Sequence, residues 1–273
     1  MQYILFDKEL FKQGIKLLYR LAVNETETIY SNNATGILKQ LFQIALPGTE
    51  ASLKQRKEIL QEFYQNMETN IELELLTDVL NSALHTGHFS RMGGVEQQGF
   101  EIKKDYIPES YNEIFEYYKF ILDTLLDSAK TKNNRKAIDV ILDHFIPLAR
   151  YSNETCNIML SMVTEIQEHK LIAPQILYQE LTKIIKLLKY KNNENIKNIV
   201  DFLENVKNQL EQLSPAVQIE TLFNIDSWNI IEPEDNHFET FINIIANAYK
   251  KFSKDMLIEE KLNFIKNCIQ NKY

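Results

Sequence analysis

Apolar residues recur at intervals of three and four along most of the chain, and strict alternation of apolar and polar positions nowhere persists. In the segment YNEIFEYYKFILDTLLDSA, the positions Ile114, Tyr118 and Ile121 illustrate this spacing. Such spacing lines one face of an α-helix, whereas a strand needs a period of two. We therefore predict an all-α protein with helices over 7–29, 33–46, 50–67, 70–85, 110–130, 133–149, 153–169, 173–190, 193–211, 215–224, 236–252 and 254–271.

Capping residues and prolines support these divisions. Thr49 or Ser52 is a suitable N-cap for the helix that follows Pro47-Gly48, and Ser214-Pro215 has the order expected at a helix start. Pro147 and Pro174 mark two further junctions, because proline removes a donor and clashes inside a helix.

The helices follow one another in pairs joined by short polar connections such as KNNRK and KNNEN. Stacked helix pairs of about 35 to 45 residues define α-solenoids of the HEAT, armadillo or TPR kind. No repeat consensus is present, so we expect irregular HEAT/TPR-like repeats forming an α-solenoid. A compact multi-helix bundle is the alternative.

All seven glycines lie at or before Gly99, and four of them fall in the window HTGHFSRMGGVEQQGFE, residues 85–101. Glycine permits backbone conformations that other residues rarely adopt, so special backbone geometry is expected in this first part. We predict an N-terminal helical subdomain over 1–109 with a long Gly-rich loop at 85–109. A helical-repeat subdomain over 110–273 continues from it.

Charge and composition limit the possible partners. The formal net charge of −8 argues against broad binding to nucleic acid or anionic lipid. No apolar run of about 18 residues occurs, so no membrane span is expected, and the N-terminal apolar run is too short for a signal peptide. Cys156 and Cys268 form neither a disulfide framework nor a metal spacing, and we expect a cytoplasmic protein.

The sequence lacks the main catalytic motifs. There is no G-x-x-x-x-G-K-[ST] phosphate loop, no H-E-x-x-H zinc helix and no G-x-S-x-G nucleophile turn. We assign no catalytic residue, no metal ligand and no cofactor, and an interaction protein is favoured over an enzyme.

The window 85–101 is the best candidate for a binding site, because a long loop inside a compact helical protein is usually functional or disordered. Its candidate binding residues are His85, His88, Arg91, Glu96 and Gln98. His85, His88 and Glu96 offer three metal ligands but no fourth. The alternatives are that His85 packs against or caps its helix end as a partly cationic imidazole, and that Arg91 pairs with Glu96 to brace the loop.

Three other features have simple structural explanations. The lysines of KIIKLLKYK, residues 183–191, are expected in water around a buried stripe. Tyr117, Tyr118 and Phe120 are expected in the core, and Trp228 is expected to pack under a loop.

Residues 33–60 and 83–129 resemble a helical segment of large bacterial multidomain proteins that carry a STAND-type or related P-loop ATPase domain, several of them linked to antiphage defence. The residues that carry this resemblance are Leu46, Gly48, Thr49, Arg56, His88, Phe89, Arg91, Gly94, Glu96, Gln98, Gly99, Pro108, Tyr111, Glu113, Ile114, Tyr117 and Tyr118. The resemblance implies a sensor or scaffold region that lies beyond the ATPase, either cut from a larger protein or standing alone. It names no catalytic residue.

The expected function is therefore a non-catalytic protein-interaction or sensing module of a bacterial assembly, of the kind linked to antiphage defence. Its partner would be a separate protein or an attached ATPase or effector domain. The alternative is a small enzyme or a nucleotide- or phosphate-binding protein with its site on the 85–101 loop.

Overall fold

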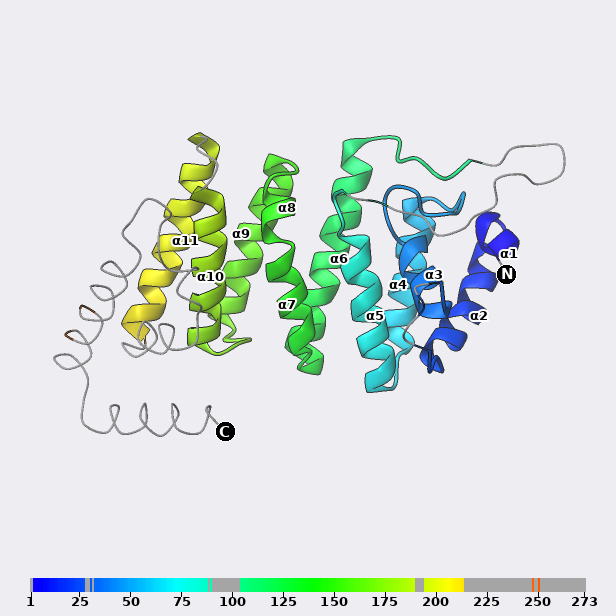
Figure 1. The fold of residues 1–273 in the computed structure, drawn as a ribbon, viewed down its shortest axis with the longest axis horizontal. Coiled ribbons are helices and arrows are strands. Elements are labelled where there is room, and N and C mark those ends of the chain that lie inside the picture. The colour runs from blue at the N-terminus through cyan, green and yellow to red at the C-terminus, as the bar shows by residue number, and fades with distance from the viewer. Residues whose placement is uncertain are drawn as a thin grey trace. The chain divides into compact units, whose positions relative to one another are not determined.

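The computed structural model describes residues 2–27, 30, 32–87, 89, 104–189 and 194–213, together with 247 and 250. Within these residues every regular element is an α-helix, which confirms the all-α prediction. In chain order (Figure 1) the helices are α1 (Gln2–Phe6), α2 (Phe11–Val23), α3 (Ala34–Leu41), α4 (Leu53–Asn66), α5 (Asn70–Ala83), α6 (Tyr111–Lys132), α7 (Arg135–Asp143), α8 (Phe145–Ala149), α9 (Asn153–Glu168), α10 (Pro174–Lys189) and α11 (Glu194–Leu213). No helix in the described ranges is long and apolar enough to cross a membrane.

The predicted ends of α4, α5, α6, α9, α10 and α11 agree with the structure to within a few residues. Capping explains the agreement at α4 and α5. Ser52 forms a capping box with Gln55, so Ser52 and not Thr49 is the N-cap, and Thr69 forms the same arrangement with Glu72. The helices predicted over 215–224, 236–252 and 254–271 fall outside the described residues apart from positions 247 and 250.

The prediction of one helix over 7–29 is wrong at both ends, because α2 spans only Phe11–Val23 and a turn separates it from α1, which ends at Phe6. The Oδ1 atom of Asp7 accepts hydrogen bonds from the N–H groups of Glu9 (2.9 Å) and Leu10 (3.2 Å). A side chain that bonds to nearby backbone donors offers the chain an alternative to continuing a helix. The periodicity continues through this turn and hides it.

The prediction of one helix over 133–149 is also wrong, because the helix divides at His144 into α7 and α8. Pro147 explains the division. In an uninterrupted helix its ring would crowd the carbonyl of Asp143, and it has no N–H to donate there. The chain turns at His144 and α8 begins anew.

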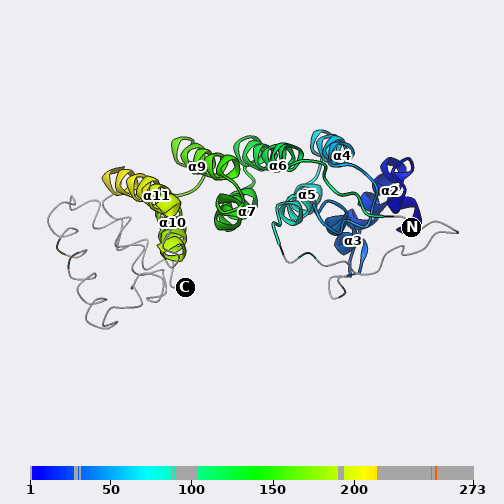
Figure 2. The ribbon, with the colours of Figure 1, turned by 90° about the horizontal axis from the view of Figure 1, so that it is seen from above.

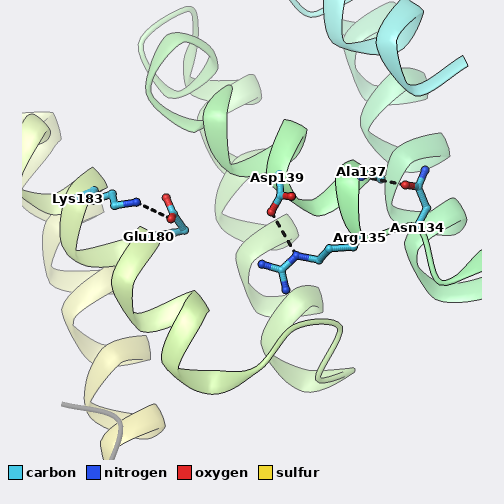
Figure 3. Close-up of polar contacts among 6 residues, drawn as sticks. All are labelled: Asn134, Arg135, Ala137, Asp139, Glu180 and Lys183. Atoms are coloured by element: carbon cyan, nitrogen blue, oxygen red, sulfur yellow. Dashed lines mark hydrogen bonds and ion pairs between the residues drawn. The ribbon is translucent and has the colours of Figure 1, made fainter. Parts of the chain in front are cut away.

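The connection between α6 and α7 is the expected Asn- and Lys-based turn. Asn133 adopts a left-handed conformation with φ of 53°, and the Asn134 side chain accepts a hydrogen bond from the Ala137 N–H at 3.3 Å (Figure 3). The Asn134 amide also donates to the hydroxyls of Thr77 (2.8 Å) and Ser128 (3.2 Å). One buried amide therefore caps α7 and joins it to α5 and α6.

The chain divides into two compact units, Met1–Met162 and Val163–Tyr273, so the division falls within α9. The subdomain boundary expected at 109/110 stays a prediction.

In the first unit, α4 and α6 lie in one row, and α3, α5 and α7 lie in a second (Figure 2). Contacts within the rows join α4 to α6, α3 to α5 and α5 to α7, and contacts between the rows join α5 to α4 and to α6. The facing sides of these helices bury apolar residues, among them Leu60, Leu80, Ile121, Leu125 and Ile138. Each such side chain stabilises the fold by about 1.5 to 3 kcal/mol relative to exposure.

In the second unit, α10 packs against α11, with Leu181 and Leu203 fully buried. Lys207 lies 4.7 Å from the ring centroid of Tyr178 and 3.6 Å from the carboxylate of Glu204. Burial lowers the pKa of Lys207 despite this carboxylate. The methylene stem of the lysine therefore covers apolar surface while its charge is partly compensated.

The segment 42–52, which links α3 to α4, is irregular although the periodicity predicts helix to residue 46. Leu46 and Gly48 have positive φ angles of 50° and 76°. Glycine adopts this region freely, whereas leucine does so at a cost. The helix cannot continue through such residues, so the carbonyls at the end of α3 need partners from elsewhere.

Candidate functional site

Of the five candidate binding residues, the structure describes His85. His88, Arg91, Glu96 and Gln98 lie outside the described residues, so the Arg91–Glu96 pair and the shared face of His85 and His88 stay predictions.

His85 directly follows the end of α5, and its surroundings are built by helices distant in sequence. Its backbone carbonyl accepts a hydrogen bond from the Tyr118 hydroxyl at 2.9 Å, so α6 fixes the position of the residue that follows the C-terminal end of α5. Its ring lies 5.6 Å from the ring of His144, measured between centroids. The ring of His85 thus contacts His144 although the residue is exposed, and its role in binding stays a prediction.

The expectation of a partly cationic His85 stays a prediction, and the direction of its pKa shift runs against it. Burial, followed by the positive charge of Lys39, lowers the pKa of His85 below its usual value. A lowered pKa means that the neutral imidazole is favoured near pH 7, whatever the helix dipole contributes.

His144, between α7 and α8, is more strongly perturbed. It is buried, and its Nε2 atom lies 2.7 Å from Oδ1 of Asn81 on α5. A carbonyl oxygen only accepts, so Nε2 carries the proton of the neutral ring. Burial lowers the pKa of His144 to about 4, and the neighbouring His85 lowers it further in the same direction. His144 is thus neutral at physiological pH, and the contact between the two rings connects the end of α5 to the α7–α8 junction.

Tyrosines extend this group toward the start of α6. Tyr118 meets Tyr151 edge to face, with centroids 5.5 Å apart and planes at 89°. Burial raises the pKa of Tyr151, and the nearby Tyr111 raises it further. We call His85, Tyr111, Tyr118, His144 and Tyr151 the histidine–tyrosine cluster. It joins the end of α5 to the first turns of α6 and to the residues on either side of α8.

A pinned turn, residues 104–111, ends with the first residue of α6 and leads into this cluster. The Tyr106 N–H donates to the carbonyl of Thr49 at 2.8 Å, and the Tyr106 hydroxyl donates to Glu113 at 2.6 Å. The other oxygen of Glu113 accepts from the Glu109 N–H at 3.0 Å. These bonds hold the turn in one conformation.

The pinned turn displays two large apolar side chains. Ile107 is 77% exposed and Tyr111 is 78% exposed, the highest values among the large apolar residues that the structure describes. Because the side chain of Ile107 stays in water, its apolar surface contributes little burial energy to the fold. It is available for contact with another molecule.

A second unusual group lies at the end of α3. The guanidinium of Arg56 is fully buried and donates from Nη1 to the carbonyls of Gln43 (2.6 Å) and Leu41 (3.4 Å). The Tyr117 hydroxyl donates to the Phe42 carbonyl at 2.9 Å. Because the helix does not continue past α3, no N–H group of a further helical turn donates to these carbonyls. The side chains of Arg56 and Tyr117 donate to them instead.

Sequence reasoning treated Arg56 only as part of a resemblance, although a local signal was available. Leu53, Arg56, Leu60 and Phe63 follow one another at helical spacing, and all four are buried. An arginine on the apolar face of an amphipathic helix indicates a buried cation. His144 offered no such signal, because its partners Asn81 and His85 are distant in sequence.

The remaining candidates behave as simple structural residues where they are described. On α10, Ile184, Ile185 and Leu188 are buried, and Lys183 pairs with Glu180 at 2.7 Å (Figure 3). Tyr117 and Tyr118 are buried as predicted, whereas Trp228 lies outside the described residues.

A search of the described part of the chain for groups of three or more His, Cys, Asp or Glu side chains able to hold a metal ion finds none. No protein-family model, curated protein or solved structure matches this chain.

Proposed function

We propose that this chain is a protein-interaction module, built from stacked helix pairs of the α-solenoid type, that binds a protein partner at the start of α6. The observation that carries the proposal is the pair Ile107 and Tyr111, 77% and 78% exposed on a turn that is fixed by hydrogen bonds. Exposed apolar anchors held in their bound conformation lose little entropy on association.

The arrangement of the first unit supports the solenoid interpretation. Two rows of helices, with neighbours in contact within and between the rows, are the arrangement expected of stacked helix pairs. Repeat architectures commonly present binding residues at one end of the helices, where the connecting loops lie.

The partner we propose is a separate protein, or an ATPase or effector domain of the kind implied by the resemblance to bacterial defence-linked proteins. The formal net charge of −8 disfavours nucleic acid as the partner. Aromatic and branched apolar anchors at the centre of a surface are typical of protein interfaces.

The alternative of an enzyme on the 85–101 loop gains no specific support from the described residues. A histidine whose pKa is about 4, such as His144, is a weak base near neutral pH.

The test uses an Ile107→Ser/Tyr111→Ser double variant, with Ile71→Ser as the matched control, because Ile71 is also an exposed isoleucine (61%) but lies on α5. Tagged proteins are incubated with host lysate and retained proteins are quantified by mass spectrometry. We expect a stoichiometric partner with wild type and the control, and its loss with the double variant at unchanged thermal stability. Equal retention by all three forms would show that the pinned turn is not the interface.

A further inference from the structure

The guanidinium of Arg56 is a cation that uses two of its five N–H donors. The residue is 0% exposed, and Nη1 alone makes the two hydrogen bonds to the carbonyls at the end of α3. Within the part of the chain that the structure describes, the buried Nε and Nη2 atoms have no hydrogen-bond partner. A buried donor without a partner costs about 1 to 3 kcal/mol, and more when it carries charge.

The two unpartnered atoms are not an arbitrary pair. In the planar guanidinium group, the N–H bond of Nε and one N–H bond of Nη2 point in parallel along the same edge. This edge is the fork that binds two oxygens of a carboxylate or phosphate at once. Arg56 therefore keeps a complete bidentate edge available while its remaining nitrogen anchors it to the backbone.

The surroundings of Arg56 stabilise the cation without occupying this edge. Burial lowers the pKa of Arg56, while the negative charges of Glu113 and Asp105 raise it. Both oxygens of Glu113 accept other hydrogen bonds, from Tyr106 and Glu109. The face of the guanidinium is covered by the ring of Tyr106, whose centroid lies 5.7 Å from Cζ.

A further polar atom without a partner belongs to the residue that Arg56 contacts. The Oε1 atom of Gln43 is buried and unpartnered, while its Nε2 atom donates to the Ser82 hydroxyl at 3.1 Å. Phosphate and carboxylate groups both carry unprotonated oxygens that accept hydrogen bonds from the arginine fork.

We propose that Arg56 is the anchor of a binding site for a small oxyanion, a phosphate or a carboxylate, which its free edge binds through two oxygens. The observations that carry this site differ from those that carry the interface proposed at Ile107 and Tyr111, although Tyr106 of the pinned turn lies beside both. Because the guanidinium is fully covered, the ligand reaches it only when a covering segment moves. Tyr106 belongs to such a segment, and its N–H is held to the carbonyl of Thr49 at 2.8 Å.

The first test follows the Arg side-chain Nε–Hε resonances of the ¹⁵N-labelled wild-type chain while inorganic phosphate is added at constant ionic strength. Acetate and sulfate are titrated in parallel to separate a phosphate from a carboxylate ligand. We expect the Arg56 resonance to shift in a saturable way, with a dissociation constant of about 1 mM or tighter. If none of the three anions shifts it saturably while the chain stays folded, the proposal is overturned.

The second test compares Arg56→Lys with Arg135→Lys by calorimetric titration of phosphate. Lysine keeps the charge but has no bidentate edge, whereas Arg135 is an exposed arginine paired with Asp139 and serves as the control. We expect Arg56→Lys to weaken phosphate binding at least about tenfold, because two charge-assisted hydrogen bonds are lost. Equal affinity in the two variants would overturn the proposal. Should Arg56→Lys not fold, the resonance titration of the wild type decides alone.

Discussion

Acidification should destabilise the first unit through His144, and the effect can be separated from all other titrating groups. His144 is buried, and burial holds its pKa at about 4 in the folded chain, against 6.5 for the exposed side chain. Because the folded pKa is the lower one, the unfolded chain takes up the proton first as the pH falls. The stability associated with the neutral ring is therefore complete above about pH 6.5 and is lost progressively toward pH 4.

The magnitude follows from this difference. Each pH unit between the two pKa values changes the free energy of unfolding by about 1.4 kcal/mol. Between pH 8 and pH 5, the contribution of His144 falls by about 2 kcal/mol, and by about 3 kcal/mol once the pH lies well below 4. His85 adds a change of the same sign, since its pKa is also lowered.

The assay is urea unfolding at pH 8 and at pH 5, followed by far-UV circular dichroism, for wild type and His144→Gln. Glutamine is a suitable replacement because its side-chain amide can still donate to Oδ1 of Asn81 but does not titrate. Carboxylates and other histidines titrate in both proteins. Their contributions to the change in unfolding free energy between pH 8 and pH 5 therefore largely cancel when the two proteins are compared.

We expect wild type to lose about 2 kcal/mol more than His144→Gln when the pH is lowered from 8 to 5. A direct readout is the titration of the His144 ring by NMR, which should give a midpoint near the value of about 4. If wild type and variant lose the same stability to within about 0.5 kcal/mol, the ring is not buried in its neutral form and the reasoning fails.

Three further substitutions test the local geometry by urea unfolding. Gly48→Ala should destabilise by about 1 to 2 kcal/mol, because φ is 76° at this position, and an unchanged midpoint would contradict the left-handed conformation. Asn134→Ala should cost about 1 to 2 kcal/mol, since it removes the N-cap of α7 and the bonds to two hydroxyls; a loss below about 0.3 kcal/mol would rule out that cap. Arg135→Ala removes an exposed ion pair within α7 and should change stability by no more than about 0.5 kcal/mol, so a larger loss would show that Arg135 has a role the structure does not reveal.

The sequence predicted best those helices in which local signals agree. In α4 and α5 the periodicity, the N-cap residues Ser52 and Thr69 and their capping boxes all indicate the same boundaries. In the segment after α3 the same reasoning fails, because the periodicity continues to residue 46 while the chain stops being helical at Leu41. What ends this helix is tertiary: Arg56 and Tyr117, from α4 and α6, supply donors to the carbonyls there.

The candidate site shows the same limit. Composition alone singled out the glycine-rich window that begins at His85, because the rest of the chain reads as regular helix. The neighbours of His85 could not be inferred, since Tyr118 and His144 reach it from α6 and the α7–α8 junction. Propensity and spacing describe one segment at a time, whereas a site is defined by segments that meet only in the folded chain.

One helix, α6, with the turn before it connects these observations. The backbone N–H of Tyr106 donates a hydrogen bond to the carbonyl of Thr49. The hydroxyls of Tyr117 and Tyr118 donate to the carbonyls of Phe42 and His85. All three carbonyls belong to residues outside the helices. Tyr106 also covers the guanidinium of Arg56 and directly precedes the exposed Ile107.

The proposed oxyanion site and the proposed interface therefore share the residues of the pinned turn. Any movement of Tyr106 that admits an anion to Arg56 also moves Ile107. If both sites exist, phosphate must change the affinity for the protein partner, and the partner must change the affinity for phosphate by the same factor. Phosphate is titrated with and without the partner, and the partner is titrated with and without phosphate. The two ratios of dissociation constants must be equal. A coupling factor of one in both experiments would show that the turn does not connect the sites.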